Sequence, residues 1–241
     1  MIKHWYLTGD IHGQIPVENW RIAVDTPYDE SAIIILGDAG FNYYLNKKDS
    51  KVKDKVAEEF PGLTVYCVHG NHEERPEKLE NIESVYDEDT HNHIWVEKNY
   101  PNIRYFHMWG EYKIAGYSTF VMGGAFSVDK EYRLLNHWQW FPTEQMTLNE
   151  KLDMLHYVDK KHFDLILSHT CPYTWQPFDL FLPFIDQSKV DNGMEHLFED
   201  VLQNIFFDKW CYGHFHDDRW QNDRARMFYT DCVKIESIMD K

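Results

Sequence analysis

Cysteine is scarce in this sequence, and no two cysteines form a Cys-x-x-Cys pair. Cys67, Cys211 and Cys232 lie within strand-like runs, where a small buried thiol is the ordinary role. A nucleophilic role for Cys171, which follows His169 closely, has no local motif to support it. The cysteines therefore give no indication of zinc or redox chemistry.

Long apolar runs, linkers and repeats are also absent from the 241 residues. No apolar run is long enough to span a membrane, and no Pro/Gly/Ser-rich tract divides the chain. The hydrophobic fraction of 43% is that of a folded protein. Residues 1–8 lead directly into the first polar motif, which leaves no room for a signal peptide. We therefore expect a single domain over residues 1–241, located in the cytoplasm, with no membrane partner.

Basic residues are few, since 24 Lys and Arg face 40 Asp and Glu, giving a formal net charge of -16. No Lys/Arg-rich tract is available to follow a phosphate backbone, so long nucleic acid is a disfavoured partner. Bound cations can dominate the local field, however, so an acidic exterior is compatible with phosphate binding in a crevice.

Five short segments end apolar, β-like runs with residue types that bind metals. They are Gly9-Asp10-Ile11-His12-Gly13, Gly37-Asp38, Gly70-Asn71-His72-Glu73, Ser168-His169 and Gly213-His214-Phe215-His216. Carboxylate, imidazole and amide oxygen suit ions such as Mn²⁺, Fe²⁺ or Zn²⁺. Ligands just past strand ends meet in the crevice where open α/β sheets bind ligands, and glycine lets the backbone approach closely. The pattern predicts a two-metal hydrolytic site.

Any one of these segments alone is more typical of a turn or a buried histidine. The non-functional alternative, in which these are glycine turns with incidental histidines, would have to account for all five segments at once. In the last segment, strand alternation predicts that His214 and His216 point to the same side and reach neighbouring ions.

The ordered motifs GD-x-H, GD, GNH, H and GH-x-H resemble those of the calcineurin-like metallophosphoesterases over residues 8–216. The resemblance implies two divalent ions, with Mn²⁺ expected and Fe²⁺, Fe³⁺ or Zn²⁺ as alternatives. It further implies that Asp38 bridges the ions and that His72 protonates the leaving group. The implied ligands are Asp10, His12, Asp38 and His216 for one ion, and Asp38, Asn71, His169 and His214 for the other.

Two departures separate this chain from the protein Ser/Thr phosphatases of that superfamily. Phe41 stands where those enzymes carry the carboxylate that orients the catalytic histidine, so the partner of His72 is unassigned. Their HGG segment is replaced by residues 168–172, Ser-His-Thr-Cys-Pro. The chain is more similar to compact bacterial and phage phosphoesterases, which have a segment like Met122–Lys130.

Periodicity places these motifs on expected elements. We expect strands at 2–8, 32–36, 63–68, 164–167 and 209–212, helices at 49–60, 143–161 and 193–207, and antiparallel strands of a second sheet at 103–108, 112–117 and 119–122. The resemblance implies an α/β fold, a four-layer α/β/β/α sandwich of two mixed sheets with the dinuclear metal site at the strand ends.

Residues 123–142 are expected to lie over the crevice, because enzymes place substrate contacts on loops held by a rigid scaffold. Within this segment Arg133 and Lys130 are candidate phosphate contacts, and Arg75 is a third. The alternative is a solvated loop anchored by its tryptophans. The loop 170–190 is a candidate second wall.

Three functions fit these features. A phosphomonoesterase that acts on a phosphoprotein or a small metabolite is preferred, and a phosphodiesterase or nuclease is the first alternative. The third is a non-catalytic metal-binding scaffold, against which the intact ligand set and His72 argue. The sequence does not predict the substrate or the oligomeric state.

Overall fold

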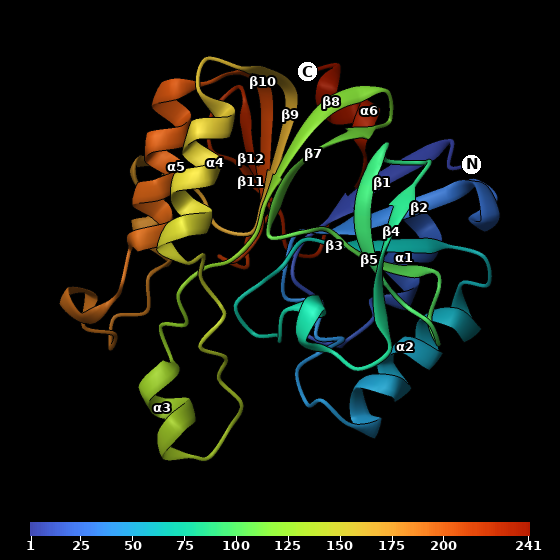
Figure 1. Cartoon of the computed structure of the whole chain (residues 1–241), viewed down its shortest axis with the longest axis horizontal. Coiled ribbons are helices and arrows are strands. Elements are labelled where there is room, and N and C mark those ends of the chain that lie inside the picture. Colours follow the sequence, from blue (N-terminus) through green and yellow to red (C-terminus); the bar gives the residue numbers. More distant parts are fainter.

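Two mixed β-sheets face each other at the centre of the computed structural model, which describes residues 1–241 (Figure 1). The first sheet has the strand order β13-β1-β2-β3-β6-β5-β4, and the second has the order β11-β12-β10-β9-β8-β7. The central strands of each sheet run parallel, and antiparallel strands complete both edges.

The strand bounds are as follows. The first sheet contains β1 (His4–Thr8), β2 (Ser31–Ile35), β3 (Thr64–Cys67), β4 (Ile82–Asp87), β5 (Asn92–Glu97), β6 (Ile103–Tyr105) and β13 (Cys232–Lys234). The second contains β7 (Trp109–Ile114), β8 (Tyr117–Met122), β9 (His162–Ser168), β10 (Phe206–Tyr212), β11 (Arg219–Trp220) and β12 (Ala225–Met227).

Helices cover the outer faces of both sheets. The α-helices are α1 (Val17–Ala23), α2 (Lys47–Glu59), α3 (Lys130–Leu135), α4 (Leu148–Val158), α5 (Gly193–Asn204) and α6 (Ile235–Met239). Short 3-10 helices occur at Tyr28–Glu30, Pro76–Lys78, Tyr173–Trp175, Phe178–Leu180 and Gln187–Lys189. None of the helices is both long enough and apolar enough to cross a membrane.

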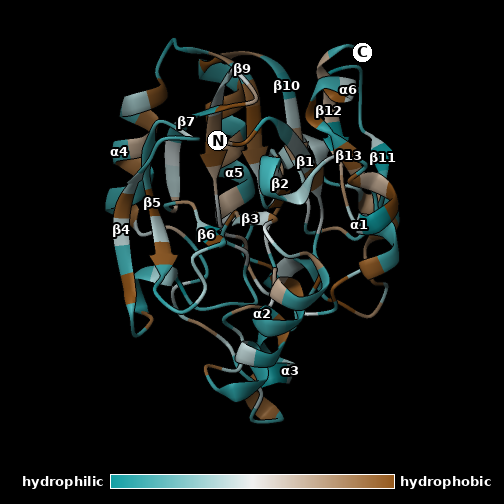
Figure 2. Ribbon diagram, turned by 90° about the vertical axis from the view of Figure 1, so that its right-hand side faces the viewer, coloured by the Kyte–Doolittle hydropathy of each residue, from teal (hydrophilic) through white to brown (hydrophobic).

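Three apolar layers hold the helices and sheets together. Met154 from α4 and Phe198 from α5 pack on the second sheet, whereas Trp20 from α1 and Val56 from α2 pack on the first. The middle layer lies between the sheets, and Ile34 of β2 faces it while its neighbours in the same strand face the helices. Figure 2 shows hydrophobic residues gathered in the central strands. The predicted four-layer α/β/β/α sandwich is confirmed.

One strand prediction was wrong, and one hairpin was not predicted. Ile103–Tyr105 belongs to the first sheet, where β6 pairs parallel with β3, instead of the second. The predicted pair at 112–122 does form an antiparallel hairpin in the second sheet. The β4–β5 hairpin fills the edge beside β6. Alternation reports which face of a strand is buried, but it does not identify the neighbouring strand.

Two predicted helices are shorter than expected. The helix predicted at 143–161 begins at Leu148, because Thr147 and Glu150 form a reciprocal capping box. The helix predicted at 193–207 ends at Asn204, and β10 begins at Phe206. Helix ends are the part of a periodic pattern that is hardest to locate from sequence.

Candidate metal centre

Five parallel strands from the two sheets end at one place, and the predicted ligands follow them. The first sheet contributes residues after β1, β2 and β3, and the second contributes residues after β9 and β10. Carboxyl ends of parallel strands are where α/β sheets bind ligands. The residues brought together are Asp10, His12, Asp38, Asn71, His72, His169, His214 and His216.

Glycines make this convergence sterically possible. A Cβ atom on Gly37 would lie 2.0 Å from Nδ1 of His169, and one on Gly70 would lie 2.0 Å from Oδ1 of Asp38. Both distances are far inside van der Waals contact, so a side chain at either position would displace a ligand.

Several site residues adopt the left-handed backbone conformation that non-glycine residues rarely use. The φ angles are 46° at His12, 49° at Asp38, 70° at His214 and 54° at His216. The two C-terminal histidines therefore lie in a turn after β10 and not in a strand, so the alternation argument for their orientation was wrong. The turn is held by the backbone N–H of His214, which donates to Oδ1 of Asp10 at 3.0 Å.

Asp10, His12 and His216 form the first cluster of ligand atoms. Nε2 of His12 lies 3.0 Å from Nε2 of His216, which in turn lies 3.4 Å from Oδ2 of Asp10. Oδ2 of Asp10 is buried and has no hydrogen-bond partner. The nearby carboxylate of Asp10 raises the pKa of His216 above its ordinary value. An unpartnered carboxylate oxygen beside two imidazoles matches the donor set of a divalent ion.

Asp10, Asp38 and His169 form the second cluster, with Asn71 beside them. Nδ1 of His169 donates to the carbonyl of Leu36 at 2.8 Å, so Nε2 of the neutral ring is an acceptor. That Nε2 lies only 2.8 Å from Oδ1 of Asn71, which is also an acceptor. Two buried acceptors that face each other cannot form a hydrogen bond, but Nε2 of His169 and Oδ1 of Asn71 could both bind one cation.

Asp38, a member of the second cluster, also lies near His12 of the first. Its Oδ2 is 3.9 Å from Nδ1 of His12, and its Oδ1 is 3.7 Å from Nε2 of His169. Burial disfavours the charged carboxylate, but His72, His169 and His12 together hold the pKa of Asp38 well below its usual range. Asp10 is the residue common to both clusters, which the sequence did not indicate.

His214 is the remaining predicted ligand. Its ring packs edge-on against His169, with centroids 4.9 Å apart, and it lines the same hollow as Asp38 and Asn71. Burial and the neighbouring His169 lower the pKa of His214 to about 3, so its imidazole is neutral and available as a ligand.

His72 lies between Asp38 and Arg133. Its backbone N–H donates to Oδ1 of Asp38 at 2.8 Å, and its Nε2 is 3.8 Å from Oδ2 of the same residue. Nη2 of Arg133 approaches Nε2 of His72 at 3.4 Å. Burial lowers the pKa of His72, the guanidinium of Arg133 lowers it further, and Asp38 opposes both. Nε2 of His72 therefore lies between the guanidinium of Arg133 and the carboxylate of Asp38.

Arg133 is held in place by two side chains that the sequence did not single out. Its Nε donates to Asp129 at 2.7 Å, and its Nη1 donates to the hydroxyl of Tyr43 at 2.9 Å. The segment 123–142 thus reaches the metal centre, although it contains the short helix α3 and is not wholly irregular. Figures 1 and 2 show α3 projecting from the body of the molecule.

The other two predicted phosphate contacts lie elsewhere. The guanidinium of Arg75 is buried and donates to the carbonyls of Thr143 and Gln145 and to the carboxylate of Glu150. Nζ of Lys130 lies 4.0 Å from the centre of the Trp140 ring. These positions argue against substrate contacts by Arg75 and Lys130, because both cations are engaged with other parts of the protein.

Two hollows meet at His72. One, of about 470 Å³, extends from Asp38, Asn71 and His214 toward the loop 180–192. The other, of about 400 Å³, extends from His12 toward Tyr43 and Arg133. The loop 170–190, predicted as a second wall, thus lines the first hollow. The guanidinium of Arg219 in β11 donates two hydrogen bonds of 2.7 Å to the carboxylate of Asp179 in this loop.

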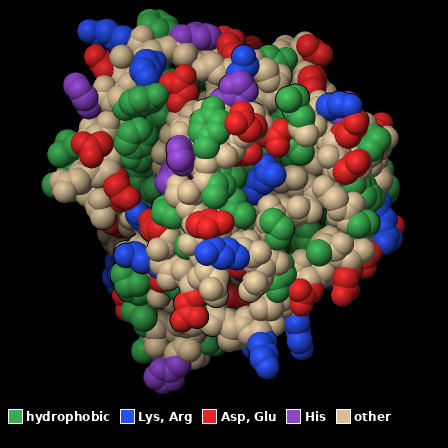
Figure 3. All heavy atoms as spheres, turned by 45° about the vertical axis from the view of Figure 1, so that its right-hand side comes forward, with side chains coloured by type: hydrophobic (Ala, Val, Ile, Leu, Met, Phe, Trp, Pro, Cys, Tyr) green, Lys and Arg blue, Asp and Glu red, His purple; other side chains and the backbone are tan.

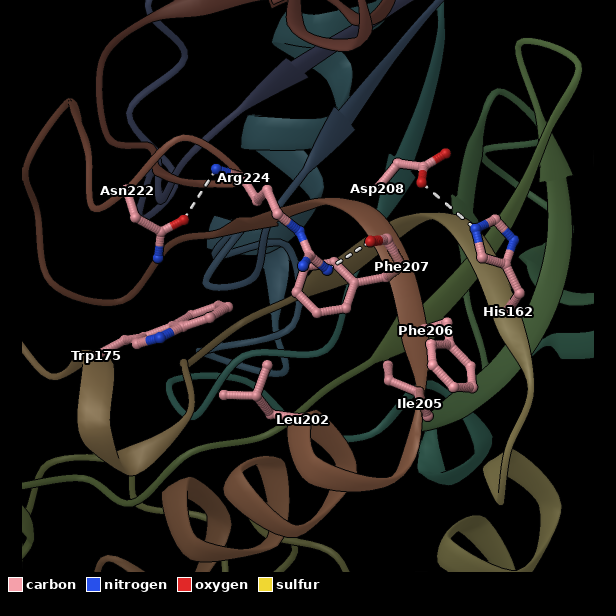
Figure 4. Close-up of a pocket in the computed structure, with 9 residues that line it drawn as sticks. All are labelled: His162, Trp175, Leu202, Ile205, Phe206, Phe207, Asp208, Asn222 and Arg224. Carbon is pink, nitrogen blue, oxygen red and sulfur yellow. Dashed lines mark hydrogen bonds and ion pairs between the residues drawn. The ribbon is translucent and has the colours of Figure 1, made fainter.

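A larger hollow of about 580 Å³ lies at the opposite end of the second sheet (Figure 4). It contains none of the predicted ligands, and its one cation, Arg224, lies over the ring of Phe207. His162 and Asp208 face each other there, and with Asp164 they could hold a cation, but His162 and Asp208 are exposed. Size alone therefore does not identify the functional site.

The match to a known family covers most of the chain. A family model of calcineurin-like phosphoesterases matches residues 5–218, a range that contains every predicted ligand. No curated protein matches the chain. The converging carboxylates and imidazoles agree with the divalent ions that this family uses. The chain therefore belongs to the calcineurin-like phosphoesterases and is a metal-dependent phosphoester hydrolase.

Proposed function

We propose that this protein is a phosphomonoesterase that works with two Mn²⁺ ions. The observation that carries the proposal is the position of Arg133, whose Nη2 lies 3.4 Å from Nε2 of His72. The other two nitrogens of the guanidinium are bound by Asp129 and Tyr43, so Nη2 is the one left for a ligand.

The number of free phosphate oxygens connects this geometry to a monoester. A monoester has three terminal oxygens, and a diester has two. If the candidate ligands held two ions and each ion were bound by one terminal oxygen, a third terminal oxygen would remain only in the monoester. In this proposal Arg133, which lies beside His72, binds that third oxygen through a charge-assisted hydrogen bond.

The side chains have separate tasks in this proposal. When bound, the ions neutralise phosphate charge and make an attacking hydroxide available near neutral pH. Arg133 orients the phosphate, and Asp129 and Tyr43 fix the plane of its guanidinium. His72 carries a proton to the departing oxygen from Nε2, and the hydrogen bond from its backbone to Asp38 fixes its place.

A phosphodiesterase is the second candidate, because His72 lines both hollows and a diester must extend on both sides of the phosphorus. A long nucleic acid is disfavoured as the diester. The net charge is -16, and acidic side chains are spread among the basic ones on the face in Figure 3.

Parallel assays of two synthetic esters test the proposal. Para-nitrophenyl phosphate should be hydrolysed with a higher kcat/KM than bis-para-nitrophenyl phosphate, and single-stranded DNA should be a poor substrate, all in Mn²⁺. Arg133→Ala should lower kcat/KM for the monoester roughly 10- to 150-fold, since a hydrogen bond to a charged group contributes about 1.5–3 kcal/mol. Arg133→Lys should retain part of the activity.

Arg21→Ala serves as the control, because Arg21 is an exposed arginine of α1 paired with Glu18 and Glu59. Equal losses on both esters in Arg133→Ala would contradict the assignment of a third phosphate oxygen to Arg133. Preference for the diester would favour the second candidate. If the fully metal-loaded protein hydrolyses neither ester, the proposal is wrong and a non-catalytic metal-binding scaffold is favoured instead.

A further inference from the structure

Asn71 can serve a metal ion only in one of its two orientations. The amide oxygen is an acceptor that can bind a cation, whereas the NH₂ group is a donor that cannot. Oδ1 of Asn71 faces Nε2 of His169 in the second cluster, so the oxygen points to the metal position. Something must keep the amide from turning over.

A chain of hydrogen bonds from Glu144 fixes this orientation. The hydroxyl of Ser127 donates to Oε2 of Glu144 at 2.6 Å, which leaves Oγ of Ser127 as an acceptor. Nδ2 of Asn71 donates to that Oγ at 2.9 Å. Because the NH₂ group is bound on this side, Oδ1 must face His169.

Glu144 is itself held as an acceptor. Its Oε2 also accepts from Nε1 of Trp140 at 2.9 Å, and its Oε1 accepts from the backbone N–H of Ser127 at 3.3 Å. Asn71, Ser127 and Glu144 are each no more than 2% exposed. Water therefore cannot replace either bond, and each bond is stronger than it would be at the surface.

We propose that Ser127 and Glu144 are positioning residues that set the direction of the Asn71 amide and thereby the affinity of the ion beside His169. The inference rests on the proposed two-ion centre, but it does not depend on whether the substrate is a monoester or a diester. Partners of metal ligands commonly change metal affinity 10- to 100-fold when they are removed.

Calorimetric titration of the chelator-treated protein with Mn²⁺ alone is the test. Ser127→Ala should bind one ion with the wild-type affinity and the other roughly 10- to 100-fold more weakly. Ser127→Thr keeps the hydroxyl and should restore much of the affinity. Glu144→Ala removes the acceptor that holds the Ser127 hydroxyl, so it should also weaken the ion beside His169.

Thr90→Val is the matched control, because Thr90 also donates a buried hydroxyl to a carboxylate, that of Asp87 at 2.8 Å, away from the metal centre. It should bind both ions as the wild type does. The thermal unfolding of each metal-free variant separates metal affinity from loss of the fold.

Three results would overturn the inference. If Ser127→Ala binds both ions with wild-type affinity, Ser127 does not position Asn71, although the two-ion centre itself would stand. Equal weakening of both ions, together with a lower Tm of the metal-free variant, would show a general structural role instead. A wild-type protein that binds fewer than two Mn²⁺ ions would overturn the two-ion centre itself.

Discussion

At the scale of single residues, the pKa of His72 depends on two neighbours of opposite charge, Asp38 and Arg133. Asp38 favours the protonated imidazole, whereas burial and Arg133 favour the neutral one. A phosphate that binds Arg133 would compensate the positive charge beside His72, so substrate binding itself would raise the pKa of this histidine. Proton transfer would then be linked to the presence of the substrate.

His72→Ala should therefore keep both metal ions but lose roughly 10²–10⁴-fold in kcat, the range typical of a positioned general acid. Esters with good leaving groups should lose less, because they need little protonation. Steady-state kinetics with para-nitrophenyl and alkyl phosphates at matched metal content will measure this. Equal losses for both esters would instead indicate that His72 only positions the substrate.

The candidate ligands that the sequence indicated come together in the structure, but the direction of several side chains could not be predicted from the sequence. Gly37 and Gly70, which precede Asp38 and Asn71, lie where other parts of the site approach the backbone closely. This signal lies within a few residues of each ligand, so the sequence alone reveals it. The reach of an arginine depends on which distant elements surround it. Arg75 lies close in sequence to Asn71 and yet binds the start of α4, whereas Arg133 is distant in sequence and faces His72.

At the scale of elements, Arg75 clamps the loop after β3 to the start of α4. Its guanidinium binds the carbonyls of Thr143 and Gln145 and both carboxylate oxygens of Glu150. Burial opposes the ionisation of Glu150, but the hydrogen bond from Arg75 holds its pKa below the ordinary value. The clamp connects the segment carrying Asn71 and His72 to the helix that follows the 123–142 segment.

Arg75→Ala should lower the free energy of unfolding by about 1–3 kcal/mol, because two carbonyls lose a buried donor. Since the pKa of Glu150 is lowered in the folded state, the stabilisation is present above the ordinary pKa of a glutamate and is lost as the pH falls through the lowered value. The gap between variant and wild type should therefore narrow in acid. Urea unfolding at several pH values measures it.

Lys3→Ala, which removes an exposed pair with Glu30, is the control and should change the stability little. A gap between Arg75→Ala and the wild type that stays constant at every pH would assign the effect to the carbonyls alone, without a contribution from Glu150.

The elements that sequence predicted best are those with one continuous apolar face. Ser31–Ile35 is buried throughout, as expected of a central parallel strand, and its pattern needed no tertiary context. Ile82–Asp87 has only one buried residue, so its pairing with β5 leaves no clear apolar signature. The fold class was therefore predictable, while the strand order at the sheet edge was not.

At the scale of the whole molecule, the metal centre joins the two sheets. Asp10, His12, Asp38 and Asn71 follow strands of the first sheet, and His169, His214 and His216 follow strands of the second. An ion held by both groups binds only when the sheets are packed together. Metal binding is thus linked to folding.

Removal of the metal should lower the Tm. At Mn²⁺ concentrations about 100 times the Kd, each bound ion contributes about 2.7 kcal/mol, which corresponds to roughly 5–10 °C per ion for a protein of this size. Asp38→Asn should lose most of this metal-dependent rise in Tm, because it removes a carboxylate of the second cluster that also lies near His12 of the first. Thermal unfolding with Mn²⁺ and with EDTA, together with elemental analysis, measures both effects. Full metal loading and unchanged activity in Asp38→Asn would remove Asp38 as the bridge.

The pairing of β13 with β1 has a consequence for the order in which the protein matures. β1 is made before the other twelve strands, yet the edge that pairs with β13 stays open until β13 has been made after them. His214 and His216 also appear only after the other ligands. The complete set of candidate ligands therefore exists only after residue 216 has been made, and a ribosome stalled before residue 214 would display an open strand edge and an incomplete ligand set. Such nascent chains are natural targets for chaperones and proteases.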